Sequence, residues 1–185
     1  MIKRFSSLFI ITLMTVLFFI PSAYGIEDIK MEVNIDGGYV STSATIVPSV
    51  EFMEDFKNGL GKNLLITIEL YRRWSIIPDE FIANVQIQRA MSSDPIKGEF
   101  TVKSILRDVL LEKRFNNYSD AIKWAMHIEP TKVADISRLE KGTYYLKITV
   151  ESNIKRLPSI LENFLFFIPK YEKKISKNSE SFKLP

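Results

Sequence analysis

The stretch MEVNIDGGYVSTSATI, residues 31–46, decides the fold class of this chain. Apolar and polar residues alternate on both sides of Asp36-Gly37-Gly38, and such alternation is typical of a strand with one buried face. The two glycines supply the positive φ angles that a two-residue turn requires. The stretch therefore predicts an antiparallel β-hairpin.

The same alternation recurs along most of the chain. Apolar residues at every second position predict a strand across 64–70 and another across 81–91, in which Phe81 shares the buried face with Met91. Three further strands are predicted at 100–102, 109–115 and 144–154. Because antiparallel sheets commonly bury one face, a half-buried antiparallel sheet is the simplest interpretation.

Three stretches depart from the alternation and predict helices. Ser49 and Asn117 can each accept hydrogen bonds from the amides of a first helical turn, so each is expected to begin a helix. A third helix is expected to begin at Pro158 and to end before Pro169. The pattern indicates an α+β, β-rich fold, an antiparallel sandwich or curled sheet of about seven to nine strands with two or three short helices.

The first 25 residues have the composition of an export signal. Lys3 and Arg4 are followed by an almost wholly apolar run, residues 8–20, and small residues precede Gly25. A membrane span needs about 20 apolar residues, which is longer than this run. We therefore expect a signal peptide that is cleaved after Gly25 rather than an anchor.

Removal of the signal leaves residues 26–185, which we expect to be a single exported β-rich domain with a basic C-terminal segment at 170–185. The formal charge of +3 falls to +1, because Lys3 and Arg4 leave with the signal and no acid does. A nearly neutral exported chain is not expected to bind nucleic acid. The absence of cysteine excludes disulfides, thiolate metal sites and lipid attachment through an N-terminal cysteine.

No constellation of catalytic residues stands out, so we expect a protein that is not an enzyme and needs no cofactor or metal. His127 is the only histidine and is expected to be structural. Glycoside hydrolysis needs two carboxylates about 5–10 Å apart across a cleft. Paired acids occur at Glu54-Asp55 and at Asp79-Glu80, and a hydrolase would use carboxylates such as Asp79 and Glu80. A carboxylate-dependent hydrolase is therefore the alternative function.

Two clusters of residues are candidate binding surfaces. Arg72, Arg73 and Trp74 combine the side-chain types that anchor protein interfaces, so they are candidate partner-binding residues. The second cluster joins the aromatic-rich 158–168 helix to a cationic segment, a composition typical of contact with an anionic membrane surface. Its candidate residues are Phe164, Phe167, Lys170, Lys173 and Lys174. A helix that is apolar on nearly all sides is normally buried, so we favour a helix packed on the sheet and followed by a solvated tail, with membrane contact as the alternative.

Several short motifs follow one another in a distinctive order. They are the 50–61 helix, Tyr71-Arg72-Arg73-Trp74, Asp79-Glu80, the 117–126 helix, Gly142-Thr143-Tyr144-Tyr145 and Arg156-Leu157-Pro158. In this order they resemble the bacterial exported family called domain of unknown function 4390. The resemblance implies a signal peptide, a periplasmic or envelope location and a gene often found beside a nitrogen-regulation-type sensor kinase, with no assigned activity or catalytic residues. We therefore expect a non-catalytic module that binds another envelope protein, with a sensor-kinase ectodomain as the candidate partner.

Overall fold

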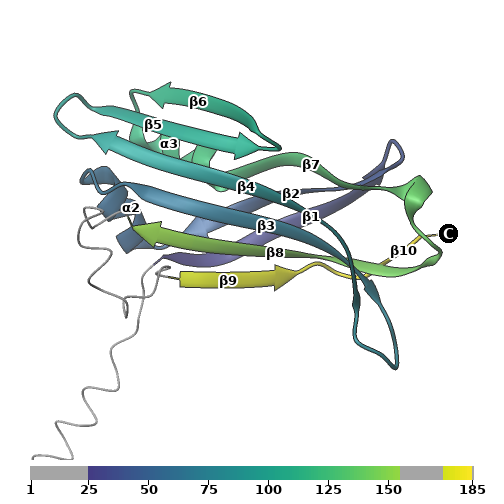
Figure 1. Cartoon of the computed structure of the whole chain (residues 1–185). Helices are drawn as coiled ribbons and strands as arrows, with labels where there is room; N and C mark the ends of the chain where they lie inside the picture. Colours follow the sequence, from purple (N-terminus) through teal and green to yellow (C-terminus); the bar gives the residue numbers. More distant parts are fainter. Residues whose placement is uncertain (1–24, 155–172, 185) are drawn as a thin grey trace, which may run out of the picture.

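The computed structural model describes residues 25–154 and 173–184, which form two antiparallel sheets and two α-helices (Figure 1). This arrangement confirms the predicted α+β, β-rich sandwich. The predicted signal peptide up to Tyr24 and the predicted helix at 158–168 lie outside the described residues.

The smaller sheet has three strands in the order β1-β2-β7. They are β1 (Ile26–Asp36), β2 (Tyr39–Pro48) and β7 (His127–Asp135), and the 3-10 turn η1 (Ile136–Arg138) follows β7. β1 and β2 form the predicted hairpin, and Gly37 and Gly38 adopt φ angles of 58° and 79° in its turn. The sequence did not predict β7, because its buried residues do not alternate regularly. A register shift in its pairing with β2 places the buried Ile128 and Thr131 three positions apart instead of two.

The larger sheet has seven strands. In order they are β10 (Phe182–Leu184), β8 (Gly142–Ile154), β3 (Lys62–Arg73), β4 (Glu80–Asp94), β5 (Glu99–Leu106) and β6 (Val109–Phe115), with β9 (Lys173–Asn178) also paired to β8. The described chain therefore has ten strands, against about seven to nine predicted. β9 and β10 lie in the basic C-terminal segment, which has too few apolar residues to predict strands from their alternation. Both strands form because their backbones pair with β8.

The core lies between the two sheets. Leu64, Ile66, Ile68 and Leu70 of β3 are all buried on one face, as the alternation predicted. The smaller sheet contributes buried apolar residues of its own to the same cluster, namely Ile26, Ile29, Val40, Ala44, Ile46, Ile128 and Val133. One face of the larger sheet is therefore covered, and its opposite face is the outer face of the molecule.

Two short helices add apolar residues to one end of the core. They are α2 (Val50–Lys57) and α3 (Tyr118–Met126). The Ser49 hydroxyl accepts a hydrogen bond from the backbone N–H of Phe52 at 3.2 Å, and the Asn117 side chain accepts from that of Ser119 at 2.7 Å. Both predicted N-caps are therefore confirmed, and the buried ring of Phe56 anchors α2 in the core.

Phe81 lies on the face opposite to the one that the sequence predicted. Leu70 pairs with Ala83 and Tyr71 pairs with Phe81, so Ile82 is an extra residue in β4, a β-bulge. The bulge interrupts the two-residue period and turns Phe81 to the outer face, where it is 52% exposed. The predicted inward position of Phe81 is therefore wrong.

The two long sides of the sandwich differ. On the first, β1 lies against β9 and β8, and the Lys177 ammonium is 2.8 Å from a carboxylate oxygen of Asp28; we call this the closed side. On the second, the end strands β6 and β7 of the two described sheets flank a cleft; we call this the open side. There the Arg107 guanidinium donates to the Lys132 carbonyl oxygen at 2.6 Å and links the two sheets.

Candidate functional site

The hairpin of β3 and β4 extends beyond the rest of the sheet at the end away from α2 (Figure 1). Strand pairing continues as far as Arg72 and Glu80, and residues 74–79 form the connection, which we call the hairpin tip. The backbone N–H of Trp74 donates to a carboxylate oxygen of Asp79 at 3.1 Å. This bond joins the two ends of the tip and fixes its shape.

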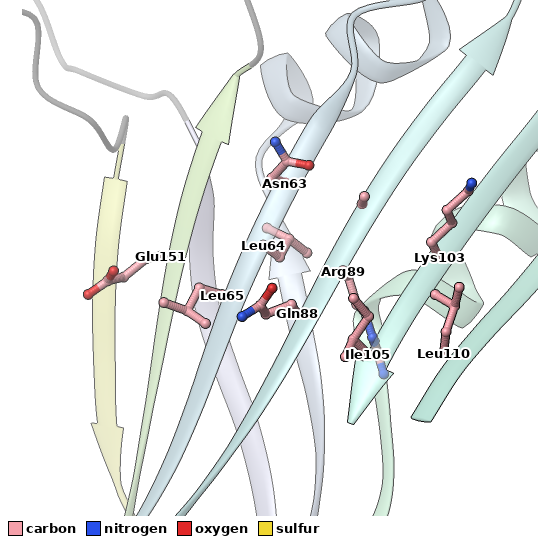
Figure 2. Close-up of a pocket in the computed structure, with 10 residues that line it drawn as sticks. Asn63, Leu64, Leu65, Gln88, Arg89, Lys103, Ile105, Leu110 and Glu151 are labelled. Carbon is pink, nitrogen blue, oxygen red and sulfur yellow. The ribbon is translucent and has the colours of Figure 1, made fainter. Parts of the chain in front are cut away.

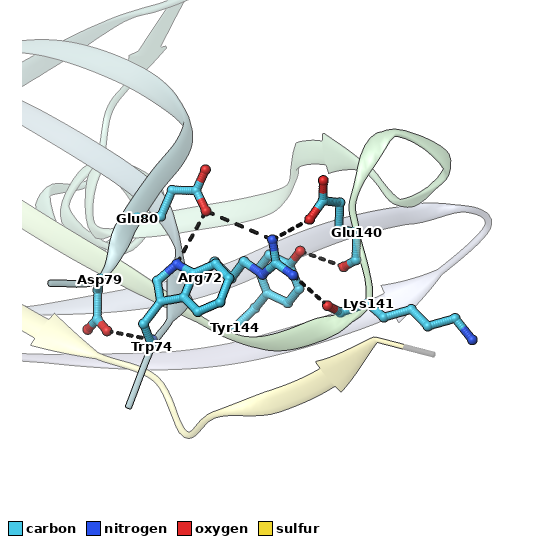
Figure 3. A network of polar contacts seen from close by, with 7 residues as sticks. All are labelled: Arg72, Trp74, Asp79, Glu80, Glu140, Lys141 and Tyr144. Atoms are coloured by element: carbon cyan, nitrogen blue, oxygen red, sulfur yellow. Dashed lines mark hydrogen bonds and ion pairs between the residues drawn. The ribbon is translucent and has the colours of Figure 1, made fainter. Parts of the chain in front are cut away.

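Arg72 holds the base of the hairpin against the segment before β8 (Figure 3). Its guanidinium forms an ion pair with Glu140 at 2.6 Å and donates to the Lys141 carbonyl oxygen at 2.8 Å. The hydrogen bond to Glu140 raises the pKa of Arg72 above its ordinary value. The same guanidinium lies 4.4 Å from the centre of the Trp74 ring. Gly142 leaves the required space, because a Cβ there would lie 2.9 Å from the Arg72 Nε.

Arg73 points to the other face of the sheet, as successive strand residues do. Its guanidinium lies 5.1 Å from the centre of the Tyr145 ring, which stacks on Tyr71 at 5.5 Å. Tyr71 in turn meets the edge of Phe81 at 5.9 Å. The structure therefore brings Arg72 and Trp74 together, whereas Arg73 belongs to a row of aromatic side chains on the outer face.

The hairpin also carries exposed apolar residues that the sequence did not single out as binding residues. Ile76 is 96% exposed, and Ile77 and Phe81 are exposed as well, beside the predicted Trp74. The signal that could have found them is the pair Ile76-Ile77 directly before Pro78, where a turn is usually polar. A group of exposed apolar side chains on a projecting element is typical of an interaction surface.

The carboxylates of the paired acids Asp79 and Glu80 accept hydrogen bonds from residues of the hairpin and its base. Asp79 accepts a hydrogen bond from the Tyr145 hydroxyl at 3.0 Å, and Glu80 accepts from the Trp74 indole N–H at 3.3 Å. Burial, together with the bond to Asp79, raises the pKa of Tyr145. The two carboxylates therefore orient aromatic side chains and do not face each other across a cleft, which the hydrolase alternative requires.

The outer face of the larger sheet has a shallow hollow of about 500 Å³ (Figure 2). Leu65, Gln88 and Ile105 line it from three neighbouring strands. Lys103 is paired with a Glu112 carboxylate at 3.1 Å, and Glu151 is paired with Lys174 at 2.7 Å. The third charged residue of the lining, Arg89, donates to the carbonyl oxygens of Trp124 and Ala125. Among the described residues, the lining of this hollow includes no convergent set of acid, base and nucleophile.

His127 caps the C-terminal end of α3 and begins β7. Its Nε2 lies 3.8 Å from a carboxylate oxygen of Glu129. Within residues 25–154 and 173–184, no three acidic or histidine side chains form a group that could hold a metal ion.

The candidate membrane-contact residues are only partly within the described chain. Phe164, Phe167 and Lys170 lie outside it, whereas Lys173 and Lys174 begin β9. Contact with an anionic membrane surface therefore stays a prediction. Among the described residues, no helix has the length and apolar character needed to cross a membrane.

Comparison with known proteins relates these features to a family. The searches of curated proteins and of solved structures gave no match. A family model described as "Domain of unknown function (DUF4390)" matches residues 22–180. The matched region contains the hairpin, its anchoring residues and every strand except β10. The match spans most of the chain and agrees with the motif order noted above, so the chain belongs to the DUF4390 family.

Proposed function

We propose that this chain is an exported, non-catalytic module of the bacterial cell envelope that binds another envelope protein through the β3–β4 hairpin. The candidate partner is the extracytoplasmic part of a membrane sensor kinase, which the family resemblance suggests. The export signal expected at residues 1–25 supports the location.

The observation that carries the proposal is the set of exposed apolar side chains on the hairpin. Trp74, Ile76, Ile77 and Phe81 are all exposed there, and Arg73 belongs to the row of aromatic side chains on the outer face that also includes Phe81. Tryptophan and arginine are enriched among the residues that dominate binding energy at protein interfaces, and large apolar neighbours exclude water around them.

The contacts at the base of the hairpin support the same proposal. Asp79 is fixed by Tyr145 and by the Trp74 backbone, and Arg72 is fixed by Glu140. A surface that is already ordered before binding loses less conformational entropy when a partner docks. The hairpin is therefore suited to binding as a preformed element.

Site-specific photo-crosslinking in the native envelope tests the proposal. A photoreactive residue at Ile76 is expected to capture one membrane protein, identified by mass spectrometry. The same residue at Ile96 is the matched control, because Ile96 is 98% exposed in the turn between β4 and β5. Equal capture at both positions would contradict the proposal.

A double variant locates the binding residues. Arg73→Ala combined with Trp74→Ala is expected to abolish the crosslink from Ile76, because both anchoring side chains are lost. An undiminished crosslink in a variant with normal melting would place the contact elsewhere on the hairpin.

A further inference from the structure

The open side of the sandwich contains a cleft of about 480 Å³, and none of the residues that line it belongs to the hairpin tip at 74–79. β4, β5 and β6 form one wall, and β7 and α3 form the other. Pockets that bind small molecules commonly have volumes of about 300–1,000 Å³. The cleft is therefore large enough for a small ligand.

Arg89 lies at the inner end of this cleft and is only 7% exposed. It pairs with the buried Leu64 in the sheet, so it points toward the interior. One terminal nitrogen donates to the carbonyl oxygens of Trp124 and Ala125 in the last turn of α3. Its Nε hydrogen, however, has no acceptor among the described residues. Arg89 nevertheless lines the cleft, and a cation that is largely removed from water is stabilised by a nearby anion, so an anionic group in the cleft would be favourable.

The charges around the cleft favour an anion. The Lys113 ammonium lies 5.1 Å from the centre of the Trp124 ring, and Arg107 lines the mouth. The opposing carboxylate is Glu129, which lies 3.8 Å from His127. Burial lowers the pKa of Arg89 to about 10, so this side chain also remains a cation at neutral pH.

The rest of the lining is apolar. Val109 and Leu111 of β6 both line the cleft, although they are 68% and 49% exposed. Ile87 and Leu106 continue the apolar surface on the neighbouring strands. A ligand that covered Val109 and Leu111 would remove apolar surface from water, which is favourable.

We propose that this cleft binds a small amphipathic carboxylate, a molecule with one anionic head and an apolar chain. The anionic head lies near the guanidinium of Arg89 and the ammonium of Lys113, which both line the cleft. The chain lies along Val109 and Leu111 toward the mouth. A medium-chain fatty acid is the simplest member of this class, and the proposal does not depend on the function proposed for the hairpin.

Trp124 gives this site its own optical reporter. The chain has two tryptophans, so Trp74→Phe leaves Trp124 as the only one. In this background we would titrate the full chain with decanoate below its micelle-forming concentration and follow tryptophan fluorescence. Decan-1-ol carries the same chain without charge, and inorganic phosphate carries charge without the chain. Decanoate is expected to saturate the signal and to bind about tenfold or more tightly than either control probe. Decan-1-ol lacks the charge that interacts with the cations, and phosphate lacks the chain that buries apolar surface.

Two neighbouring residues of β6 give matched variants. Leu111 lines the cleft, whereas Leu110 lines the hollow on the outer face. Leu111→Glu places a carboxylate beside the ligand and is expected to weaken decanoate binding about fivefold or more. Leu110→Glu adds the same charge on the opposite face and is expected to leave the affinity unchanged.

Arg89→Gln tests the head-group contact directly, and it is expected to remove the preference for decanoate over decan-1-ol. If this variant fails to fold, the Leu111 and Leu110 variants decide the question. The proposal is overturned by the lack of a saturable signal, by equal affinity for decanoate and decan-1-ol, by phosphate binding as tightly as decanoate, or by equal effects of the two glutamate substitutions. The last result would indicate a general charge effect and not a site.

Discussion

The closed and open sides of the sandwich have the same kind of border, a strand from each sheet, but different chemistry. On the closed side β1 packs against β8 and β9, and Asp28 and Lys177 join the strands. On the open side three consecutive apolar residues, Val109-Leu110-Leu111, are exposed on the end strand β6. Apolar surface that folding leaves in water contributes little to the free energy of unfolding but can still be buried by a ligand or partner. The closed side therefore stabilises the fold, and the open side is available for binding.

The largest expected effect comes from truncating one apolar side chain on each side. Ile148→Ala, in the fully buried centre of β8, is expected to lower the free energy of unfolding by about 2–5 kcal/mol, because it leaves a cavity. Leu111→Ala on the open side is expected to change it by about 0.5 kcal/mol or less. Urea denaturation of the two variants measures both values. A loss at Leu111 as large as that at Ile148 would mean that the open side belongs to the folding core.

A smaller effect is expected from the hydrogen bond that crosses the open side. Arg107→Met removes the bond to the Lys132 carbonyl, and we expect a loss of about 1 kcal/mol or less because the bond is exposed. Amide hydrogen exchange should become faster in β7 and stay unchanged in β1. Arg114→Met is the matched control. Among the described residues, this exposed side chain makes polar contacts only with Glu112 on the same strand. Faster exchange in β1 as well would show that the two sides are coupled.

Local patterns in the sequence were sufficient for most of the fold. The β1–β2 hairpin, the buried face of β3 and the caps Ser49 and Asn117 each depend on residues close together in the chain. Phe81 was misplaced because the bulged residue Ile82 lies between it and Ala83, so Phe81 lies on the face opposite to Ala83 and not on the same face. β9 was missed because Ile175 is its only apolar residue and its order comes from pairing with β8.

The candidate sites were harder to predict, because their contacts join distant parts of the chain. The motif Arg72-Arg73-Trp74 located the hairpin, but the ion pair that fixes Arg72 is with Glu140, 68 residues later. Arg89 and Trp124 of the cleft are 35 residues apart and belong to a strand and a helix. Residue types and spacing carry no signal for such pairs, so only the folded arrangement brings them together.

The smallest expected effect concerns the ion pair on the closed side. The hydrogen bond from Lys177 lowers the pKa of the Asp28 carboxyl below its ordinary value of 3.8. A carboxyl whose pKa is lower in the folded state stabilises the fold above about pH 3.8, and this stabilisation is lost as the pH falls through the folded-state pKa. Lys177→Gln is therefore expected to raise the pKa of Asp28 in an NMR titration and to reduce the dependence of stability on pH in this acid range.

Lys30→Gln is the control that distinguishes the Asp28–Lys177 hydrogen bond from the long-range effect of a nearby lysine charge on the pKa of Asp28. Lys30 acts on Asp28 only through its charge, and its effect is the weakest of those on this carboxyl, so the shift should be smaller than for Lys177→Gln. Added salt should weaken both effects, because the two partners are exposed to solvent. Equal shifts in the two variants would mean that the Asp28–Lys177 contact adds nothing specific. The closed side would then be stabilised only by apolar packing between β1, β8 and β9. The two sides would differ only in how much apolar surface each one buries.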